Sequence, residues 1–455
     1  MTFSILLALV AVGWLMVFAV GYDESVRYNS LEFFSTPIGR QTVWVGISFV
    51  AFLLIQLIDW RFWQTFAYPI YGLGIMLLVG VLVFGKTING ATSWLSIGGF
   101  TLQPSELTKF GTALAIAAFL NNYSTNLKNT NSQLSILGLL LAPILLILLQ
   151  PDAGSALVFF SFLILLYREG LPGAYYGIGF GVVLFLLLGL LLPLPVIVLG
   201  VELVFILILS FYMPQRNISI FSALVYLAIM VSMAVQTQSV YLIIPTTLIL
   251  IAMIWVLQRK PNFSFGTLMF VIFIAGSGLA FASGYVFNNV LRPHQQDRIN
   301  VWLRPELSDP RGSLYNVMQS KLAISSGGIQ GKGFLNGTMT KLNYVPEQST
   351  DFIFCTVGEE HGFIGSASII LLFSVLLIRL TILAERQKSA FSRQYIYGIA
   401  GILFVHFFIN IGMTMGLVPI IGIPLPFISR GGSALLGFSV MMAVILKLDS
   451  HRYQI

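Results

Sequence analysis

The sequence has few charged residues and almost no cysteine. Only 9% of its 455 residues are Asp, Glu, Lys or Arg, while 57% are hydrophobic and the mean hydropathy is +0.90. A soluble body of this size would need more polar surface, so a soluble protein is excluded. The single cysteine, Cys355, cannot form an internal disulfide, which leaves helix packing to hold the fold.

The chain also lacks features that would divide it or direct it elsewhere. It has no low-complexity run, no Pro- or Ser-rich linker and no internal repeat, so we predict one membrane domain over residues 1–455. The first apolar stretch, residues 5–20, has no basic leader and no small-residue cleavage site, which predicts a retained helix. The net charge of +7 fits basic loops of a membrane protein, and we expect no nucleic-acid partner.

Apolar segments of membrane-crossing length recur along the chain and lack the alternation of a membrane barrel. The predicted fold class is therefore an all-α polytopic membrane protein with about 14 transmembrane helices. With ends uncertain by about 2 to 4 residues, these lie at 3–21, 41–58, 66–84, 105–120, 133–149, 153–167, 172–192, 195–212, 218–235, 238–257, 266–287, 358–378, 395–415 and 428–447.

Basic residues in the short loops indicate the orientation. With the N-terminus inside, Arg61, Lys128, Arg168, Arg216 and the basic residues within 379–393 all face the cytoplasm, as the positive-inside rule requires. The long polar loop of residues 288–357, between the eleventh and twelfth helices, then lies outside. Its own Lys and Arg do not contradict this, because long loops are translocated largely regardless of charge.

Residues 292–365 hold the densest set of charged groups and glycine pairs in the chain, and we expect an ordered active-site loop there. Within it, Asp309 stands in Ser308-Asp309-Pro310, among Arg298, Arg304 and Arg311. Such an aspartate is either a turn residue or an ionised carboxylate able to accept a proton as general base. The glycine-rich stretch 325–333 with Lys332 is either an anion-binding segment or a plain turn.

Other polar groups lie at predicted membrane boundaries or within spans. Glu106 and Lys109, three residues apart at a helix start, form either a structural ion pair or part of a cavity wall. Asp152 either caps the next helix or lines the cavity. Glu202, inside an apolar run, favours a lipid-headgroup or helix-interface role. The Pro- and Gly-broken segment 416–433 is either a cavity wall or an ordinary loop.

Five motifs in order resemble the SEDS family (shape, elongation, division, sporulation). They are Gly90-Ala91 with Trp94, Gln103-Pro104-Ser105-Glu106 with Lys109, Gln150-Pro151-Asp152 with Gly154, the stretch 298–365, and residues 422–427 with Gly431-Gly432-Ser433. Gly331-Lys332-Gly333 followed by Asn336-Gly337-Thr338 is more similar to elongation-type than to division-type members.

The resemblance implies a peptidoglycan glycosyltransferase that polymerises lipid II during cell elongation. It would be a multi-pass protein of the bacterial cytoplasmic membrane, with its active site on the extracytoplasmic side. The implied partners are lipid II, the lipid-linked glycan strand, membrane lipids and a class B penicillin-binding protein that supplies transpeptidation. A lipid II flippase and a non-catalytic scaffold of the wall-synthesis complex are the alternatives.

The family's essential aspartate falls on Asp309, the expected general base. We expect substrate contacts from the matched stretch, with the cations steadying the pyrophosphate; these residues are Arg298, Gln319, Ser320, Lys321, Lys332, Glu347 and Asp351. No cofactor is certain, and a requirement for a divalent cation, Mg or Mn, is left open.

Three departures from the family pattern stand out. Ser93 replaces a usual arginine, and Arg430 replaces a usual aromatic residue. Family members usually have about ten helices, so residues 170–265 are predicted to add about four, an even number that leaves the active-site loop outside.

Overall fold

The computed structural model describes residues 1–22, 33–34, 36–88, 90–97, 100–123, 125–210, 263–310 and 312–453. The predicted helices 218–235 and 238–257 lie outside these ranges, as do Arg216 and Arg311. The described chain forms two compact units, residues 1–172 with 297–455, and residues 173–296.

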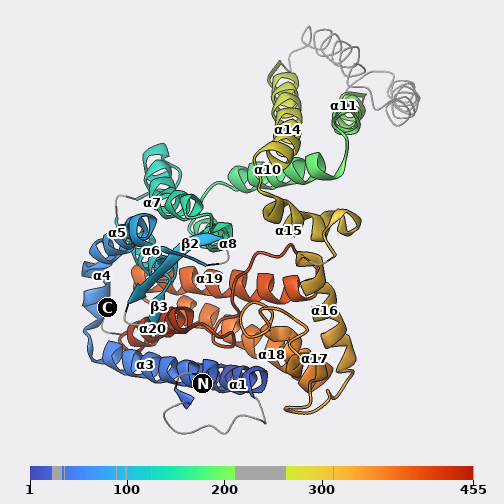
Figure 1. The fold of residues 1–455 in the computed structure, drawn as a ribbon. Coiled ribbons are helices and arrows are strands. Elements are labelled where there is room, and N and C mark those ends of the chain that lie inside the picture. Colours follow the sequence, from blue (N-terminus) through green and yellow to red (C-terminus); the bar gives the residue numbers. More distant parts are fainter. Residues whose placement is uncertain are drawn as a thin grey trace. The chain divides into compact units, whose positions relative to one another are not determined.

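The first unit holds most of the predicted spans (Figure 1). Its helices are α1 (Thr2–Gly21), α3 (Pro37–Leu57), α4 (Trp60–Thr65), α5 (Ala67–Phe84), α6 (Pro104–Leu120), α7 (Thr130–Leu149), α8 (Ala153–Val158), η1 (Phe159–Ser161), α9 (Phe162–Arg168), η3 (Pro305–Leu307), α16 (Ser313–Ser326), α17 (Thr338–Lys341), α18 (Ile353–Glu385), α19 (Ala390–Thr414) and α20 (Gly432–Ser450).

Within the described residues, the second unit contains three apolar helices and the start of a fourth. These are α10 (Gly173–Leu191), α11 (Leu194–Ser210), α14 (Phe263–Asn289) and the first residues of α15 (Pro293–Leu303), which continues into the first unit. Helices α10 and α11 occupy two of the four positions predicted for added helices. That residues 170–265 are an addition to a single membrane domain stays a prediction.

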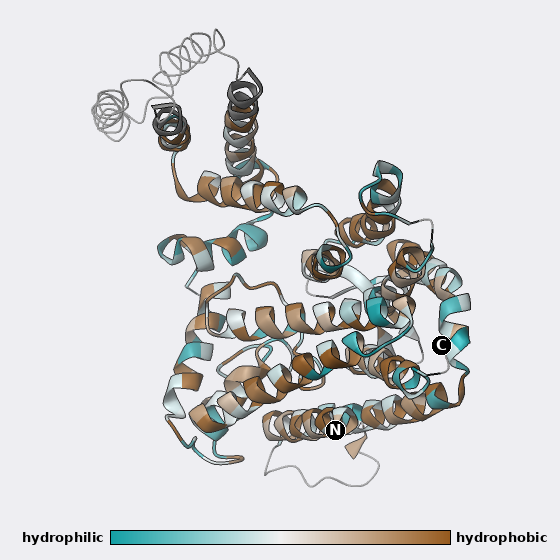
Figure 2. Cartoon of the chain, turned by 180° about the vertical axis from the view of Figure 1, so that it is seen from behind, coloured by the Kyte–Doolittle hydropathy of each residue, from teal (hydrophilic) through white to brown (hydrophobic). Residues whose placement is uncertain are grey.

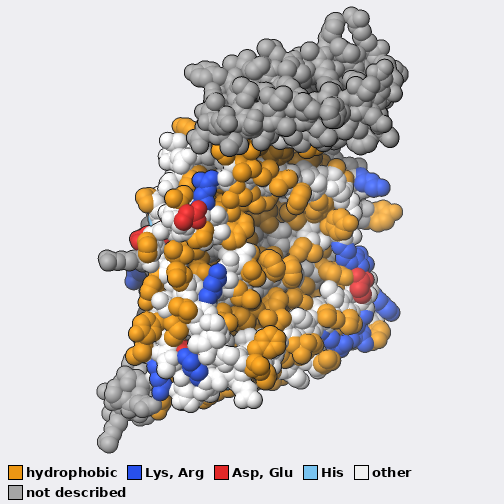
Figure 3. Space-filling model, turned by 90° about the vertical axis from the view of Figure 1, so that its right-hand side faces the viewer, with side chains coloured by type: hydrophobic (Ala, Val, Ile, Leu, Met, Phe, Trp, Pro, Cys, Tyr) orange, Lys and Arg blue, Asp and Glu red, His pale blue; other side chains and the backbone are white. Residues whose placement is uncertain are grey.

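The predicted helical membrane fold is confirmed. Nine helices within the described residues are long and apolar enough to cross a membrane. Brown, hydrophobic residues dominate these helices in Figure 2, and Figure 3 shows a face on which hydrophobic side chains cover a broad area and charges are few. A surface of this composition suits lipid rather than water. The total of about fourteen helices stays a prediction.

Helices α19 and α20 form the centre of the first unit. In the most apolar stretches of α19 and α20, 72% and 67% of the stretch is buried within the protein, whereas the share is 33% or less for the other candidate spans. Helix α19 packs against α6, α18 and α9, and α20 packs against α3. Residues on α19 therefore reach several helices at once, which makes this helix the natural support for a buried polar network.

Helix starts differ from prediction where turn chemistry overrides hydropathy. Helix α3 begins at Pro37 rather than 41, because Thr36 accepts a hydrogen bond from Gly39 N and Pro37 occupies the first helical position. Helix α20 begins at Gly432 rather than 428, because residues 426–430 form turns and bends and Gly431 has a non-helical backbone, with φ of 173° and ψ of 101°.

Between α5 and α6 lies a small antiparallel sheet that the all-helical prediction did not contain. Strands β1 (Lys86–Ile88), β2 (Ala91–Ile97) and β3 (Phe100–Leu102) run in the order β1-β2-β3. The sequence had indicated only a packed segment here. The sheet pairs backbone groups that would otherwise lie unpaired next to the helices.

Much of the long polar loop is helical, which the sequence analysis did not predict. Helices α15, α16 and α17 occupy much of residues 293–341, and α16 packs against α18 and α19. Helix α18 then begins at Ile353, and it is kinked at Gly362, whose φ of 62° and ψ of −156° are not helical.

Candidate active site

Asp309 lies in a turn that another carboxylate holds in place. Asp297 on α15 accepts hydrogen bonds from Asp309 N to Oδ1 (3.0 Å) and from Ser313 N to Oδ2 (2.9 Å). The same Oδ2 would lie 2.9 Å from a Cβ placed at Gly312, so a larger residue would displace it. The Asp309 side chain is exposed. The turn thus presents an accessible carboxylate from a fixed backbone.

A second group of charges gathers beside Gly422, in the segment between α19 and α20. A Cβ at Gly422 would lie 3.3 Å from Asp351 Oδ2 and 4.0 Å from Arg298 Nη1. Gly422 has φ +76°, a conformation that favours glycine. Glu347 and Asp152 are near enough to influence Asp351 electrostatically. Arg298, Glu347 and Asp351, predicted as substrate contacts, are therefore brought together.

Burial, together with the nearby Glu347 carboxylate, raises the pKa of Asp351 to about 6, although the Arg298 guanidinium acts to lower it. Asp351 lies two residues before the start of α18 and is only partly exposed. Ionised Asp351 thus costs the folded state free energy near neutral pH, which is a common property of groups at binding sites.

Asp351→Asn should therefore stabilise the protein at neutral pH. Because the pKa of Asp351 is higher in the folded state than its unfolded value of 3.8, its contribution to stability is fully present below pH 3.8. This contribution is lost as the pH rises through about 6. Asparagine resembles the protonated form at every pH. The increase in melting temperature of the purified variant over wild type should grow between pH 5 and pH 7 and then level off.

Glu306→Gln is the matched control, since Glu306 is an exposed carboxylate of the same loop. Its melting-temperature difference should not vary over this pH range. An Asp351→Asn effect that is constant from pH 5 to pH 8 would contradict the raised pKa.

Asp152 caps α8 and also joins this region. Its Oδ1 accepts from Ser155 N (3.0 Å), its Oδ2 accepts from Ser155 Oγ (2.8 Å), and Gln103 Nε2 donates to Oδ2 (3.0 Å). The motifs at 103–106 and 150–154, far apart in sequence, thus meet through Gln103 and Asp152. The cap is confirmed. That Asp152 also lines the cavity stays a prediction.

The segment between α19 and α20 is fixed against the end of the polar loop. Ser429 Oγ donates to Thr350 O (2.6 Å), and Arg430 N donates to Ser349 O (2.8 Å). Asn410 on α19 donates from Nδ2 to both Asp351 O and Ile423 O, each at 2.8 Å. These bonds make the segment a wall beside the charged group rather than a free loop.

Lys332, predicted to bind pyrophosphate, is already paired. Its Nζ donates to Glu359 Oε1 (2.7 Å) and Thr338 Oγ1 (2.8 Å). Buried Glu359 also accepts from Met339 N and Thr340 N, each at 2.9 Å. The lysine and the start of α17 thereby satisfy a carboxylate inside the protein, a structural function for this cation.

The predicted contacts on α16 differ in accessibility. Ser320 is buried and donates to Thr414 O (2.9 Å), which ties α16 to α19. Gln319 is partly exposed, and Lys321 is exposed. Lys321 crosses over Gly416, where an added Cβ would lie 2.6 Å from its Nζ. Of these three residues, Lys321 is the best placed to contact a ligand, and it is the only cation among them.

Glu106 and Lys109 form an ion pair in the core, with Lys109 Nζ 2.8 Å from Glu106 Oε1. Both side chains are almost fully buried, at 2% and 0% exposure. Lys109 Nζ also lies 2.9 Å from His406 Nε2, while His406 Nδ1 lies 3.0 Å from Pro424 O. Since an ammonium only donates, Nε2 must accept and Nδ1–H must donate to the carbonyl.

The sequence analysis assigned no role to two residues of these networks, Asp297 and His406. Asp297 belongs to the polar loop, but only the fold shows that its carboxylate holds the Asp309 turn. His406 lies in an apolar run 297 residues from its partner Lys109. A lone histidine inside a predicted span was the available signal, because polar groups within spans usually have partners.

No group of three or more His, Cys, Asp or Glu side chains among the described residues could hold a metal ion. The requirement for a divalent cation stays an expectation.

The family model of the cell cycle proteins FtsW, RodA and SpoVE matches residues 1–203 and 201–454. The chain belongs to this family. The match extends over nearly the whole sequence and confirms the SEDS resemblance given by the five motifs. Membership confirms a multi-pass membrane protein, in agreement with its apolar helices.

Curated relatives of this SEDS chain carry enzyme names. Peptidoglycan glycosyltransferase RodA of Treponema pallidum is 28% identical over 450 residues, covering 98% of this chain and 96% of that protein. Peptidoglycan glycosyltransferase MrdB of Escherichia coli K12 is 29% identical over 411 residues, covering 90% and 84%.

Solved structures share the fold. A chain from "Structural coordination of polymerization and crosslinking by a peptidoglycan synthase complex" has a TM-score of 0.64 and 25% identity, covering 100% of this chain and 98% of that one. Rod shape determining protein RodA of Thermus thermophilus has a TM-score of 0.56 and 22% identity, with 100% and 97% covered.

Proposed function

We propose that this SEDS protein is a peptidoglycan glycosyltransferase that polymerises lipid II into glycan strands during cell elongation. The observation that carries the proposal is similarity over 98% of the chain to a protein named peptidoglycan glycosyltransferase RodA. The active site would lie on the extracytoplasmic side of the bacterial cytoplasmic membrane. The basic residues of the short loops support this orientation of the polar loop.

The reaction needs a base and cations. The hydroxyl of the acceptor sugar loses its proton as it attacks, while the lipid pyrophosphate leaves the donor. Asp309 is the proposed base, because it is exposed and its turn is fixed by Asp297. Arg298 and Lys321 are the proposed pyrophosphate contacts. Lys332 is a weaker candidate, since its charge already pairs with Glu359.

The proposed partner is a class B penicillin-binding protein, which would crosslink the strands that this chain makes. Support comes from the similar solved structure, which is described as coordinating polymerization and crosslinking within a peptidoglycan synthase complex. Lipid II, the growing lipid-linked strand and membrane lipids are the other proposed partners.

Reconstitution of the full chain with that partner in vesicles containing lipid II tests the function. Glycan strands long enough to separate by gel electrophoresis are the expected product. Movement of lipid II between leaflets without strands would instead support the flippase, and neither activity would support the scaffold. Each result requires that the partner be bound, as shown by co-purification.

A further inference from the structure

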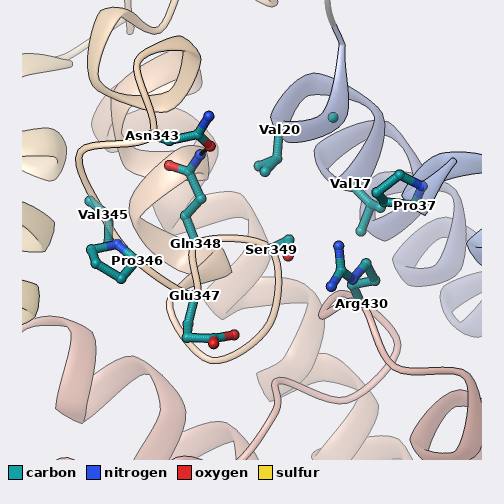
Figure 4. Close-up of a pocket in the computed structure, with 11 residues that line it drawn as sticks. Val17, Val20, Pro37, Asn343, Val345, Pro346, Glu347, Gln348, Ser349 and Arg430 are labelled. Atoms are coloured by element: carbon teal, nitrogen blue, oxygen red, sulfur yellow. Dashed lines mark hydrogen bonds between the residues drawn. The ribbon is translucent and has the colours of Figure 1, made fainter. Parts of the chain in front are cut away.

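A cavity of about 300 Å³ lies between α1, the start of α3, the loop before α18 and Arg430 (Figure 4). One wall is apolar, with Val17 and Val20 from α1 and Pro37 from α3. The other is formed by residues 343–349, which contribute the polar Asn343, Glu347, Gln348 and Ser349 beside two apolar residues. We call it the Arg430 pocket. A site with one apolar and one polar wall suits the head of an amphiphilic molecule.

Arg430 supplies the positive charge of this pocket. Its backbone is held by the bond to Ser349 O (2.8 Å), and its side chain is partly exposed. Among the described residues, the guanidinium makes no hydrogen bond or ion pair. An arginine stays charged at every physiological pH and offers a planar set of donors that matches a phosphate or carboxylate.

The beginning of α3 adds to the positive potential. Pro37, the first residue of this 21-residue helix, lines the pocket. The amino end of a helix carries a partial positive charge that favours anions. Arg430 and this helix end therefore both favour an anion in the pocket, whereas an arginine on an open surface would act without the helix end.

The opposite wall is rigid and contains acceptors. Gln348 Nε2 donates to Thr340 O (2.8 Å) and Asn343 Oδ1 (2.7 Å), which fixes its position. Glu347 and Asn343 adopt φ of 57° and 53°, strained values for residues other than glycine. In Figure 4 this wall and the guanidinium lie on opposite sides of the pocket.

We propose that the Arg430 pocket binds an anionic group, phosphate or carboxylate, of the lipid-linked sugar substrate. The sugar hydroxyls would donate hydrogen bonds to the wall that contains Glu347. The inference rests on the proposed function for the identity of the substrate. A simple phospholipid has a phosphate for Arg430 but fewer hydroxyl donors for Glu347, so the two-sided pocket favours a lipid-linked glycan.

Binding without turnover gives the direct test. The Asp309→Asn protein in neutral phosphatidylcholine nanodiscs is titrated with a fluorescent lipid II, alone and with Arg430→Gln or Arg430→Lys added. Loss of a charge-assisted bidentate contact should weaken binding about tenfold for Arg430→Gln, and by less for Arg430→Lys, which keeps the charge. Arg292→Gln, the same change at an exposed arginine outside the pocket, should leave binding unchanged.

A second measurement identifies the source of the anion. The binding of phosphatidylglycerol, in the absence of lipid II, is measured for the same variants. If Arg430→Gln weakens the binding of phosphatidylglycerol but not of lipid II, the substrate assignment is overturned. If Asp309→Asn binds lipid II with the same affinity with and without Arg430→Gln, the pocket is overturned.

Kinetics separate this proposal from the proposed function. With Asp309 intact, Arg430→Gln should raise the lipid II concentration for half-maximal polymerisation about tenfold, with kcat little changed. If the wild type makes no polymer, the proposed function fails, yet the binding titration still tests the subsite. A loss of kcat with unchanged binding would overturn the pocket.

Discussion

Asp309→Asn should abolish glycan polymerisation while leaving a folded membrane protein. Loss of a general base typically lowers a rate by about 100- to 10,000-fold. Asparagine keeps the shape of the side chain, and the bonds that hold the turn come from the backbone N–H groups of Asp309 and Ser313 to Asp297. The measurement is strand formation by purified protein with its partner, together with the amount of protein in the membrane.

Glu306→Gln provides the matched control for Asp309→Asn. Glu306 is an exposed carboxylate three positions earlier in the same loop, so the substitution removes the same charge from nearby. It should polymerise at close to the wild-type rate. Near wild-type activity of Asp309→Asn would show that another group accepts the proton, and Glu347 or Asp351 would be the next carboxylate to replace.

The helices could be predicted because each has a long apolar run, and membrane thickness sets its length. The ends depended on local chemistry. Thr36-Pro37 is itself a helix-start pattern, and it moves α3 four residues earlier than hydropathy indicates. Strands β1 and β3 have three residues each, too few for any periodicity to appear.

The site was predictable as a region but not as a set of contacts. Charge density along residues 292–365 marked the polar loop, and the carboxylate in a turn marked Asp309. That Lys332 is paired with Glu359 could not be foreseen, since 27 residues separate the two and the contact depends on how α17 meets α18. The meeting of Gln103 with Asp152 likewise depends on packing across 49 residues.

The buried ion pair should produce the largest effect on folding. Lys109→Met removes the cation and leaves the Glu106 carboxylate uncompensated in the core, where Glu106 Oε2 already has no hydrogen-bond partner among the described residues. Breaking one side of a buried pair costs about 3 to 5 kcal/mol. This is a large share of the roughly 5 to 15 kcal/mol that stabilises a typical protein. The variant should accumulate poorly and melt at a much lower temperature than wild type.

The double variant Glu106→Gln with Lys109→Met separates charge from contact. With neither charge of this pair left, much of the lost stability should return, although His406 Nε2 loses its donor. Arg168→Gln is the matched control, because it breaks the exposed pair with Glu385, whose side chains are 32% and 54% exposed. An exposed pair of this kind contributes about 0 to 1 kcal/mol. If Lys109→Met instead accumulates and melts like wild type but makes no strands, the pair acts on substrate rather than on the fold.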